Sequence, residues 1–247
     1  MHNVFQIKCT ASQSALATRV QDFNDLPQIV HDLGLPSPRP VIVAIGGAGG
    51  MTNADLDRLR PLFDEALAAI AEEIGAVVVD GGTDAGVMRL MGQVRAARSF
   101  PLVGMVVEQL AALPSQPVKE NQAALEAHHT HFVFTPGAEW GDESIWISRL
   151  ATVLAGTQPS VSVLINGGEI AYQDVTHSLE EQRPVMVIEG SGRTADVLAA
   201  ALHGKVQDRR AEPLAASRML TSVRLADGPN TLRVALTRFL HSNLHQR

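Results

Sequence analysis

Short apolar runs rich in β-branched residues, separated by longer stretches with helical spacing, constrain the fold of this chain most strongly. Most of the runs are continuous rather than alternating, which is typical of strands that helices cover on both faces. Six of them predict strands: Val41–Ile45, Ala76–Asp80, Leu102–Val107, His131–Thr135, Val161–Ile165 and Pro184–Ile188.

The stretches between these runs carry apolar residues at helical spacing. The first is an apolar stripe from Leu56 to Ile70 that Thr52 or Asn53 can cap, in which Pro61 predicts a kink or the start of a second helix. The other predicted helices are Ala85–Arg98, Asp142–Ala155, Ala195–His203 and Thr231–Leu244. This alternation predicts an α/β fold, Rossmann-like and doubly wound, with a mainly parallel sheet and helices on both faces.

The remaining segments are less regular. Val4–Ile7 predicts a strand and Leu16–Leu33 a partly helical stretch, whereas Lys205–Leu225 carries several arginines and is expected to be exposed. The stretch Glu108–Ala127, with two prolines, is expected to form a loop or a broken helix near the ligand face.

The composition argues against several classes of binding partner. The net charge is −6, which argues against a general affinity for nucleic acid or for acidic membrane surfaces. One cysteine, Cys9, allows neither an intramolecular disulfide nor a thiolate metal cluster. The N-terminus lacks the pattern of a signal peptide and no run approaches the length of a membrane span, so we expect a soluble, cytoplasmic protein.

Four glycine-bearing turns directly follow predicted strands. In an open α/β sheet, ligands bind beyond the carboxyl ends of the strands, and glycine lets the backbone approach a phosphate closely. Each turn alone is typical of a tight strand-to-helix connection, but four together indicate a phosphate-binding crevice. Neither a GxxxxGK[ST] loop nor a GxGxxG fingerprint is present, so an ordinary NAD-dependent dehydrogenase is a poor fit. The turns are Gly46–Gly50, Gly81–Gly86, Gly167–Glu169 and Gly190–Arg193.

The motifs VIVAIGGAGG, VVVDGGTDAGVMRLMG, HTHFVF, VLINGGE and VMVIEGSGRTADVLA, in this order, resemble the SLOG superfamily. That Rossmann-like group contains the Smf/DprA proteins and the LOG phosphoribohydrolases. The sequence is most similar to the prokaryotic, TRPM-associated branch, the LSDAT-type domain. The resemblance covers residues 41–202, and we expect a single domain over residues 1–247 with the flanks 1–38 and 205–247 packed on that core.

The resemblance implies a sensor that binds an ADP-ribose-like or NAD-derived nucleotide, with no resident cofactor, metal or catalytic residue. In this interpretation Glu169 meets ribose hydroxyls and Arg193 pairs with a second phosphate. The implied ligand-binding residues are Gly46, Gly47, Ala48, Gly49, Gly50, Gly82, Thr83, Asp84, Gly86, Gly167, Gly168, Glu169, Gly190, Ser191, Gly192 and Arg193.

Two alternatives stay open. LOG enzymes hydrolyse nucleotide N-glycosidic bonds with a PGGxGTxxE motif, but here Asn166 stands at the proline position, Ile170-Ala171 at the GT pair and Asp174 at the glutamate position. Glu169 or Asp174 would have to support such hydrolysis. A role in DNA binding, by analogy with Smf/DprA, conflicts with the net negative charge of the chain.

Other chemistry-bearing residues allow two interpretations each. His128, His129 and His131 favour a polar strand end over a metal site, because no third ligand is evident beside His129 and His131. Trp140 and Trp146 either stack on a base or pack in the fold, and Glu143 is interpreted as an acidic residue that stabilises a helix start. The apolar face of Thr231–Leu244 can support a homodimer.

Overall fold

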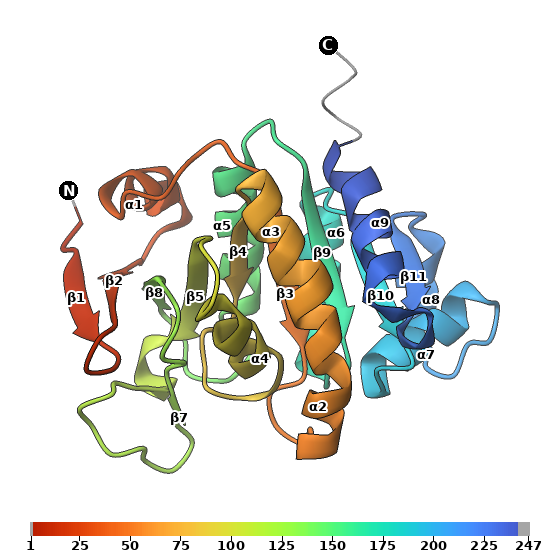
Figure 1. The fold of residues 1–247 in the computed structure, drawn as a ribbon, viewed down its shortest axis with the longest axis horizontal. Helices are drawn as coiled ribbons and strands as arrows, with labels where there is room; N and C mark the ends of the chain where they lie inside the picture. The colour runs from red at the N-terminus through yellow and green to blue at the C-terminus, as the bar shows by residue number, and fades with distance from the viewer. Residues whose placement is uncertain (1, 242–247) are drawn as a thin grey trace.

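The computed structural model describes residues 2–241 and contains a nine-stranded sheet in the order β1-β2-β8-β5-β4-β3-β9-β10-β11 (Figure 1). Every neighbouring pair is parallel except β1 and β2, so the predicted Rossmann-like fold is confirmed. Its strands are β1 (Phe5–Lys8), β2 (Ser14–Arg19), β3 (Val41–Gly46), β4 (Val77–Asp80), β5 (Leu102–Val107), β8 (His131–Thr135), β9 (Ser160–Ile165), β10 (Val185–Glu189) and β11 (Leu220–Arg224).

Helices cover both faces of this sheet. The main ones are α1 (Leu26–Asp32), α2 (Asn53–Pro61), α3 (Ala69–Ile74), α4 (Gly86–Arg95), α5 (Ser144–Ala155), α6 (Ile170–Glu180), α7 (Arg193–Leu202), α8 (Ala211–Ala216) and α9 (Gly228–His241). Side chains of α1, α5, α6, α7 and α8 pack in one apolar cluster, and those of α2, α3, α4 and α9 pack in another. The central strand β3 alternates between the two: Val41, Val43 and Ile45 face the first cluster, whereas Ile42 and Ala44 face the second.

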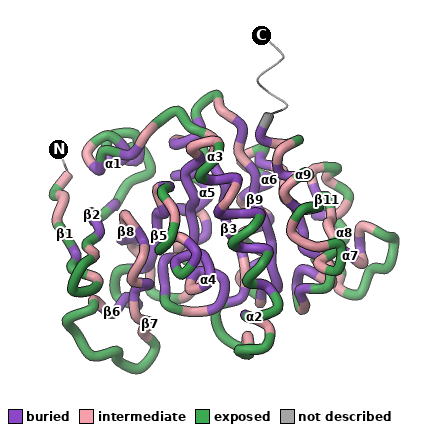
Figure 2. Tube along the Cα trace, viewed as in Figure 1, coloured by how far each residue is buried: buried purple, intermediate pink, exposed green. Residues whose placement is uncertain are grey.

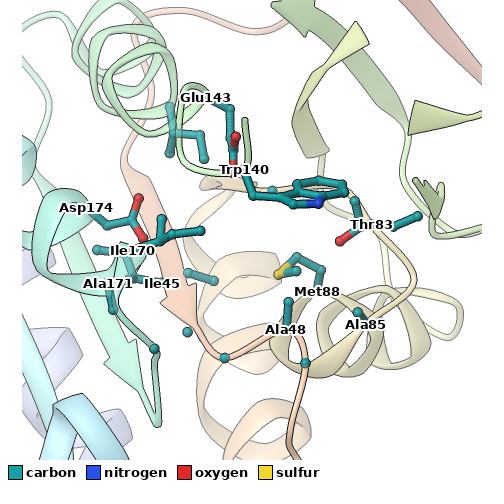
Figure 3. Close-up of a pocket in the computed structure, with 18 of the residues that line it drawn as sticks. Ile45, Ala48, Thr83, Ala85, Met88, Trp140, Glu143, Ile170, Ala171 and Asp174 are labelled. Carbon is teal, nitrogen blue, oxygen red and sulfur yellow. The ribbon is translucent and has the colours of Figure 1, made fainter. Parts of the chain in front are cut away.

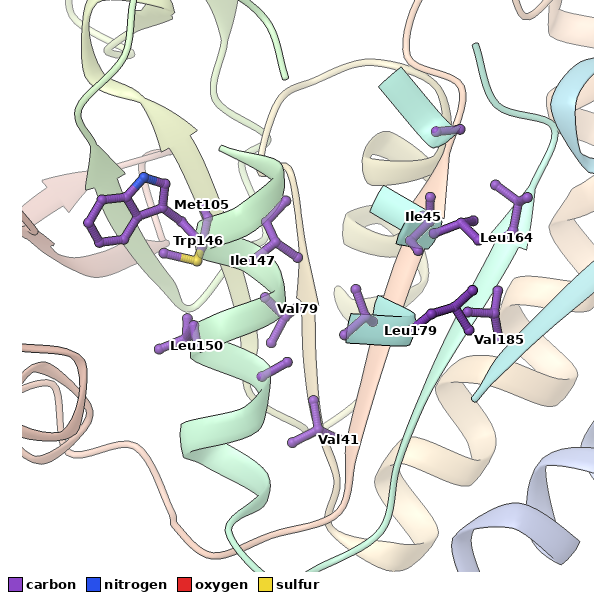
Figure 4. Close-up of a cluster of buried hydrophobic side chains, with 14 of the residues drawn as sticks. Val41, Ile45, Val79, Met105, Trp146, Ile147, Leu150, Leu164, Leu179 and Val185 are labelled. Carbon is purple, nitrogen blue, oxygen red and sulfur yellow. The ribbon is translucent and has the colours of Figure 1, made fainter. Parts of the chain in front are cut away.

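Both clusters contain side chains of the central strands as well as of the helices. The buried residues concentrate in these central strands (Figure 2). On the first face, Leu150 of α5 and Leu179 of α6 pack over β3 and its neighbours (Figure 4). A third, smaller cluster joins β1 and β2 to Phe132 and Phe134 of β8.

The six predicted core strands are present as β3, β4, β5, β8, β9 and β10, each within one residue of its predicted ends. The predicted strand Val4–Ile7 corresponds to β1. The remaining helix predictions correspond to α4, α5, α7 and α9, and the part of Thr231–Leu244 beyond residue 241 lies outside the described residues.

The structure refines the predictions about the less regular segments. Leu16–Leu33 is partly helical as predicted, but it begins inside β2, because residues 16–19 pair with β8. Lys205–Leu225 is mostly exposed as predicted, but α8 packs against α7 within it, and β11 pairs with β10. At Pro61 the helix α2 ends and a π-helical segment, η2 (Leu62–Ala68), connects it to α3.

The order of the strands fixes where a ligand can bind. From β3 the chain builds β4, β5 and β8 on one side and then returns to place β9 on the other side of β3. The connections therefore diverge beyond the carboxyl ends of β3 and β9. Such a switch point leaves a crevice, which is the usual ligand position in an open α/β sheet.

Candidate functional site

A cavity of about 520 Å³ lies at this switch point (Figure 3). The turn after β3 and the starts of α4, α6 and α7 border it, and the start of α5 and the segment before β8 close its remaining sides. Its volume is in the range of small-molecule and cofactor sites. We call the part formed by Gly46–Gly49, Gly168 and Arg193 the glycine floor.

Close packing of the main chain beneath the floor depends on glycine. A Cβ atom on Gly86, whose φ is +48°, would lie 1.8 Å from the carbonyl oxygen of Gly47. The amide of Val87 donates to the same oxygen at 3.0 Å, so the first turn of α4 is attached directly to the turn after β3. Because residue 86 is a glycine, the start of α4 can lie in direct contact with the glycine floor.

Arg193 connects the two glycine turns of the floor. Its guanidinium donates to the carbonyl oxygen of Gly49 at 3.2 Å, and a Cβ on Gly168 would lie 3.3 Å from the same group. No carboxylate among the described residues forms a salt bridge with Arg193. The side chain thus brings a positive charge to the floor, which favours an anionic ligand. Together with Arg210, this charge lowers the pKa of the neighbouring Glu169 carboxyl.

The helix starts around the cavity differ from that of α2. The α2 start is satisfied by a capping box, in which Thr52 and Asp55 exchange hydrogen bonds. In contrast, α4, α6 and α7 begin without a side-chain cap. Backbone carbonyls accept instead from amides in these first turns, namely those of Val87, Ala171 and Ala195. The positive dipole ends of the three helices still favour an anion beside the floor.

Two carboxylates form a second side of the cavity, which we call the acidic wall. Glu143 precedes the first residue of α5, and Asp174 lies in the second turn of α6 (Figure 3). Burial raises the pKa of the Asp174 carboxyl to about 7, and the nearby charge of Glu143 acts in the same direction. Burial also raises the pKa of Glu143, although the amide of Gly141 donates to its carboxylate at 2.9 Å. The wall therefore has a low tendency to carry two negative charges.

The third side combines an aromatic ring with an extended segment. Trp140 and Thr83 line the cavity together with residues 121–123, which lie between β5 and β8. This segment was expected to be a loop or a broken helix, but the short strands β6 (Ala111–Ala112) and β7 (Ala123–Ala124) form a small second sheet within it. Figure 3 shows the Trp140 indole lying across the cavity from the acidic wall toward Thr83. Trp146, in contrast, is buried and packs against Phe23 with ring centroids 4.0 Å apart. Of the two tryptophans, Trp140 is therefore the one available to a ligand.

A buried cluster of ionisable groups anchors this third side. His129 lies 2.8 Å from a carboxylate oxygen of Asp80 and 2.9 Å from one of Glu126. Asp80 also accepts from the amide of Gly82, and the amide of Glu126 donates to the carbonyl of Gly82. The cluster thus attaches the turn after β4 to the end of the loop that lines the cavity.

Hydrogen-bonding capacity remains unused at this edge of the sheet. Buried side-chain atoms without a partner in the described part of the chain include Asp80 Oδ2, Thr135 Oγ1, Ser144 Oγ and Asn166 Oδ1. Asp80 and Thr135 end strands β4 and β8, Asn166 follows β9, and Ser144 begins α5. Buried polar atoms are normally paired, so this edge is suited to a polar ligand or ordered water.

The sequence-predicted site residues divide into two groups. Eight line the cavity: Gly46, Gly47, Ala48, Gly49, Thr83, Gly168, Glu169 and Arg193. The other eight do not line it: Gly50, Gly82, Asp84, Gly86, Gly167, Gly190, Ser191 and Gly192. A Cβ on Gly82 would lie 2.9 Å from Gly104 Cα, and Ser191 is buried with its hydroxyl bonded to Ile188, so both contribute to packing.

Glu169 lies at the cavity but is already paired. Its side chain is 80% exposed and forms a salt bridge with Arg210, which lowers the pKa of the carboxyl. Sequence reasoning assigned Glu143 to a helix start and did not predict α6, so the two carboxylates of the acidic wall were not brought together. The acidic residue at the start of α5 was the one local signal for this wall.

Two further features concern residues 2–241 as a whole. No group of three or more histidine, cysteine, aspartate or glutamate side chains in this range has the arrangement of a metal site. Within the same range, every helix is too short or too polar to cross a bilayer.

Comparison with known proteins relates the chain to one family. A family model described as "SLOG in TRPM, prokaryote" matches residues 39–233. Transient receptor potential cation channel subfamily M member 2 from Mus musculus is 25% identical over 206 residues, covering 67% of this chain and 13% of the channel. A transient receptor potential channel from Caenorhabditis elegans is 27% identical and covers 70% of this chain and 10% of that protein. The chain therefore spans a small part of the length of these relatives.

Proposed function

Because the chain belongs to the prokaryotic family of SLOG domains related to those of TRPM channels, we propose that it is a sensor that binds a nucleotide-derived ligand, ADP-ribose-like or NAD-derived, in the cavity. One observation carries the proposal: the glycine floor, the positive dipole ends of three helices and the guanidinium of Arg193 converge on a single cavity. Backbone amides and a guanidinium together favour a diphosphate.

The other sides of the cavity support a nucleotide rather than a free phosphate. The Trp140 ring offers an apolar surface for a base. The carboxyl groups of the acidic wall, Glu143 and Asp174, can form hydrogen bonds with the hydroxyls of a sugar. A cavity of about 520 Å³ accommodates more than an inorganic anion.

A thermal-shift titration with ADP-ribose, cyclic ADP-ribose, NAD, ADP and AMP tests this function. A ligand at about 100-fold over its Kd stabilises the fold by about 2.7 kcal/mol. For a chain of this length each kcal/mol raises the Tm by about 2–4 °C. We expect a rise of several degrees with an ADP-ribose-like compound. The Arg193→Gln variant should lose this rise, whereas Arg149→Gln, whose arginine pairs with Glu181 outside the cavity, should keep it. No rise with any of the five compounds would contradict the proposal.

Hydrolysis of a nucleotide N-glycosidic bond is a second candidate, and the position of Asp174 favours it. Its carboxyl lines the cavity and its pKa is raised to about 7 by burial, which suits a group that donates or accepts a proton near neutral pH. Water would add its hydroxyl to the sugar carbon and a proton to the departing base.

Release of free base from AMP or NAD, followed by chromatography, tests this second candidate. Base that accumulates with the native chain and not with Asp174→Asn would replace the sensor proposal with an enzyme. Binding without any base release would leave the sensor as the function.

The proposal includes a cytoplasmic location and no nucleic-acid partner. The net charge of −6 supports the absence of a nucleic-acid partner, and a single cysteine is compatible with a reducing compartment.

A homodimer through α9 is also part of the proposal, since Val234 on that helix is 45% exposed. Sedimentation of the native chain would test it.

A further inference from the structure

The carboxylate of Glu169 pairs with one arginine and has a second arginine close by. Arg210 Nη1 lies 2.5 Å from Glu169 Oε2. The second arginine is Arg193 of the glycine floor, whose guanidinium would lie 3.3 Å from a Cβ atom on Gly168, the residue before Glu169. Two cationic groups thus surround one carboxylate, which forms its salt bridge with Arg210.

Of these two arginines, Arg193 lines the cavity and Arg210 does not. Glu169 also lines the cavity, and its side chain is 80% exposed. Within residues 2–241 its carboxylate accepts hydrogen bonds from Arg210 alone. An exposed glutamate that is held by one partner changes its rotamer rapidly once that partner is lost.

The guanidinium of Arg210 is itself held in place by two contacts outside the cavity. Asp208 Oδ2 lies 2.7 Å from Arg210 Nη2, and the amide of Arg210 donates to Asp208 Oδ1 at 2.9 Å. The same guanidinium lies over the ring of Tyr172 in α6, 4.1 Å from its centroid. Arg210 is therefore already positioned to bind Glu169 before a ligand arrives.

A carboxylate released beside Arg193 would compete with an anionic ligand for the same guanidinium. We propose that Arg210 is a positioning residue that holds Glu169 away from Arg193, so that the Arg193 guanidinium stays available to the phosphates of the ligand. Arg210 acts through Glu169 and needs no contact with the ligand. This inference rests on the proposed nucleotide-binding function.

Isothermal titration with ADP-ribose in a double-mutant cycle tests this role. Arg210→Gln should weaken binding by about five-fold, which corresponds to an exposed ion pair of about 1 kcal/mol between Glu169 and Arg193. Glutamine at residue 169 carries no charge with which to compete. In the Glu169→Gln background the same Arg210→Gln substitution should therefore change the affinity by less than about two-fold.

Arg209→Gln is the matched control, because it removes the same charge one residue away. Arg209 is exposed, does not line the cavity and forms no salt bridge with another described residue. This variant should bind ADP-ribose as tightly as the native chain. A loss equal to that of Arg210→Gln would overturn the inference, because the net charge of the segment would then account for both.

The remaining outcomes separate this inference from the proposed function. Equal binding by the native chain and Arg210→Gln overturns the inference and leaves nucleotide binding in place. A loss of the same size with glutamate and with glutamine at residue 169 also overturns it, since Arg210 would then act on the ligand or on the fold directly. Failure of the native chain to bind ADP-ribose or any of the other four compounds overturns both.

Discussion

Two clusters of ionisable groups lie at the carboxyl edge of the sheet, and they differ in how their charges are balanced. In the first, the buried His129 lies between Asp80 and Glu126, so a positive group separates two negative ones. In the second, Glu143 and Asp174 are half-buried and close enough to affect each other, and neither forms a salt bridge in the described part of the chain. The fold thus supplies a cation between the carboxylates of the first cluster and no salt-bridge partner for those of the second.

The pKa values express this difference. Burial alone would lower the pKa of His129, but the Asp80 and Glu126 carboxylates outweigh it and raise the pKa to about 9. Burial raises the pKa of Asp174 to about 7, and it outweighs the nearby hydroxyl of Ser144 and the charge of His177, which act in the opposite direction. The comparison teaches that facing carboxylates keep His129 charged at neutral pH, whereas the surroundings of Asp174 disfavour its charged form.

Replacing His129 with Gln should have the largest effect on stability. It removes the positive charge between two buried carboxylates, and breaking a buried pair in this way costs about 3–5 kcal/mol. Urea denaturation at pH 7 measures the loss in the free energy of unfolding. A loss below about 1 kcal/mol would show that the His129 cluster is not the satisfied one.

The pH dependence of the native chain tests the same cluster. The folded pKa of His129 lies above its unfolded value of 6.5, so its stabilisation is complete below about pH 6.5 and is lost as the pH rises through 9. The stability difference between the native chain and His129→Gln should therefore shrink from pH 7 to pH 10. A difference that does not change over this range would contradict a charged His129.

One glutamate from each cluster offers a matched pair of Glu→Gln variants. Glu126 accepts hydrogen bonds from both His128 and His129, and glutamine would turn an NH₂ group toward one of them. We expect Glu126→Gln to destabilise the fold by about 1.5–3 kcal/mol. Glu143 accepts from the amide of Gly141, and the glutamine oxygen can replace that bond. We expect Glu143→Gln to change stability by less than about 0.5 kcal/mol.

Both variants are measured by denaturation at pH 7, and the contrast between them is the result that matters. Equal destabilisation by the two would remove the distinction between a structural and a ligand-directed cluster. A Glu143→Gln variant that is the less stable of the two would reverse it.

Much of the fold could be predicted because its signals are local. Continuous β-branched runs are distinctive, and the strands from β3 to β10 in the main sheet follow from them. The strand β2 was missed because SALATR is short and gains its stability by pairing with β8, which lies more than a hundred residues later. The helix α6 was missed because its apolar residues, such as Ala171 and Val175, form a narrow stripe between polar ones.

The part of the site that consists of main chain could be predicted from the sequence. Glycine marks a close main-chain approach in the sequence itself, and the turns at Gly46–Gly49 and Gly168 were found in this way. The acidic wall depends on two helices, α5 and α6, that pack together only in the folded chain. The sequence places Asp174 at the glutamate position of the LOG-type motif, but nothing along the chain indicates that it is half-buried near Glu143, which requires the tertiary structure.

Replacing Asp174 with Asn should have a smaller effect than the loss of His129 or Glu126, and the opposite sign. The folded pKa of about 7 lies above the unfolded value of 3.8, so the contribution of this carboxyl to stability is complete below about pH 3.8 and is lost as the pH rises through 7. Asparagine does not ionise and avoids this loss. With each pKa unit equivalent to about 1.4 kcal/mol, and the side chain in partial contact with solvent, the variant should gain about 1–2 kcal/mol relative to the native chain between pH 4 and pH 8.

Urea denaturation of both proteins at pH 5 and pH 8 measures this gain. An advantage of Asp174→Asn that grows with pH means that the fold retains a carboxyl that destabilises it, as expected for a group whose partner is a ligand. The comparison with His129 then becomes a difference in sign, since His129→Gln weakens the fold at the same pH. An advantage that is absent or larger at pH 5 would mean that Asp174 is as well satisfied as His129, and that the fold alone accounts for both clusters.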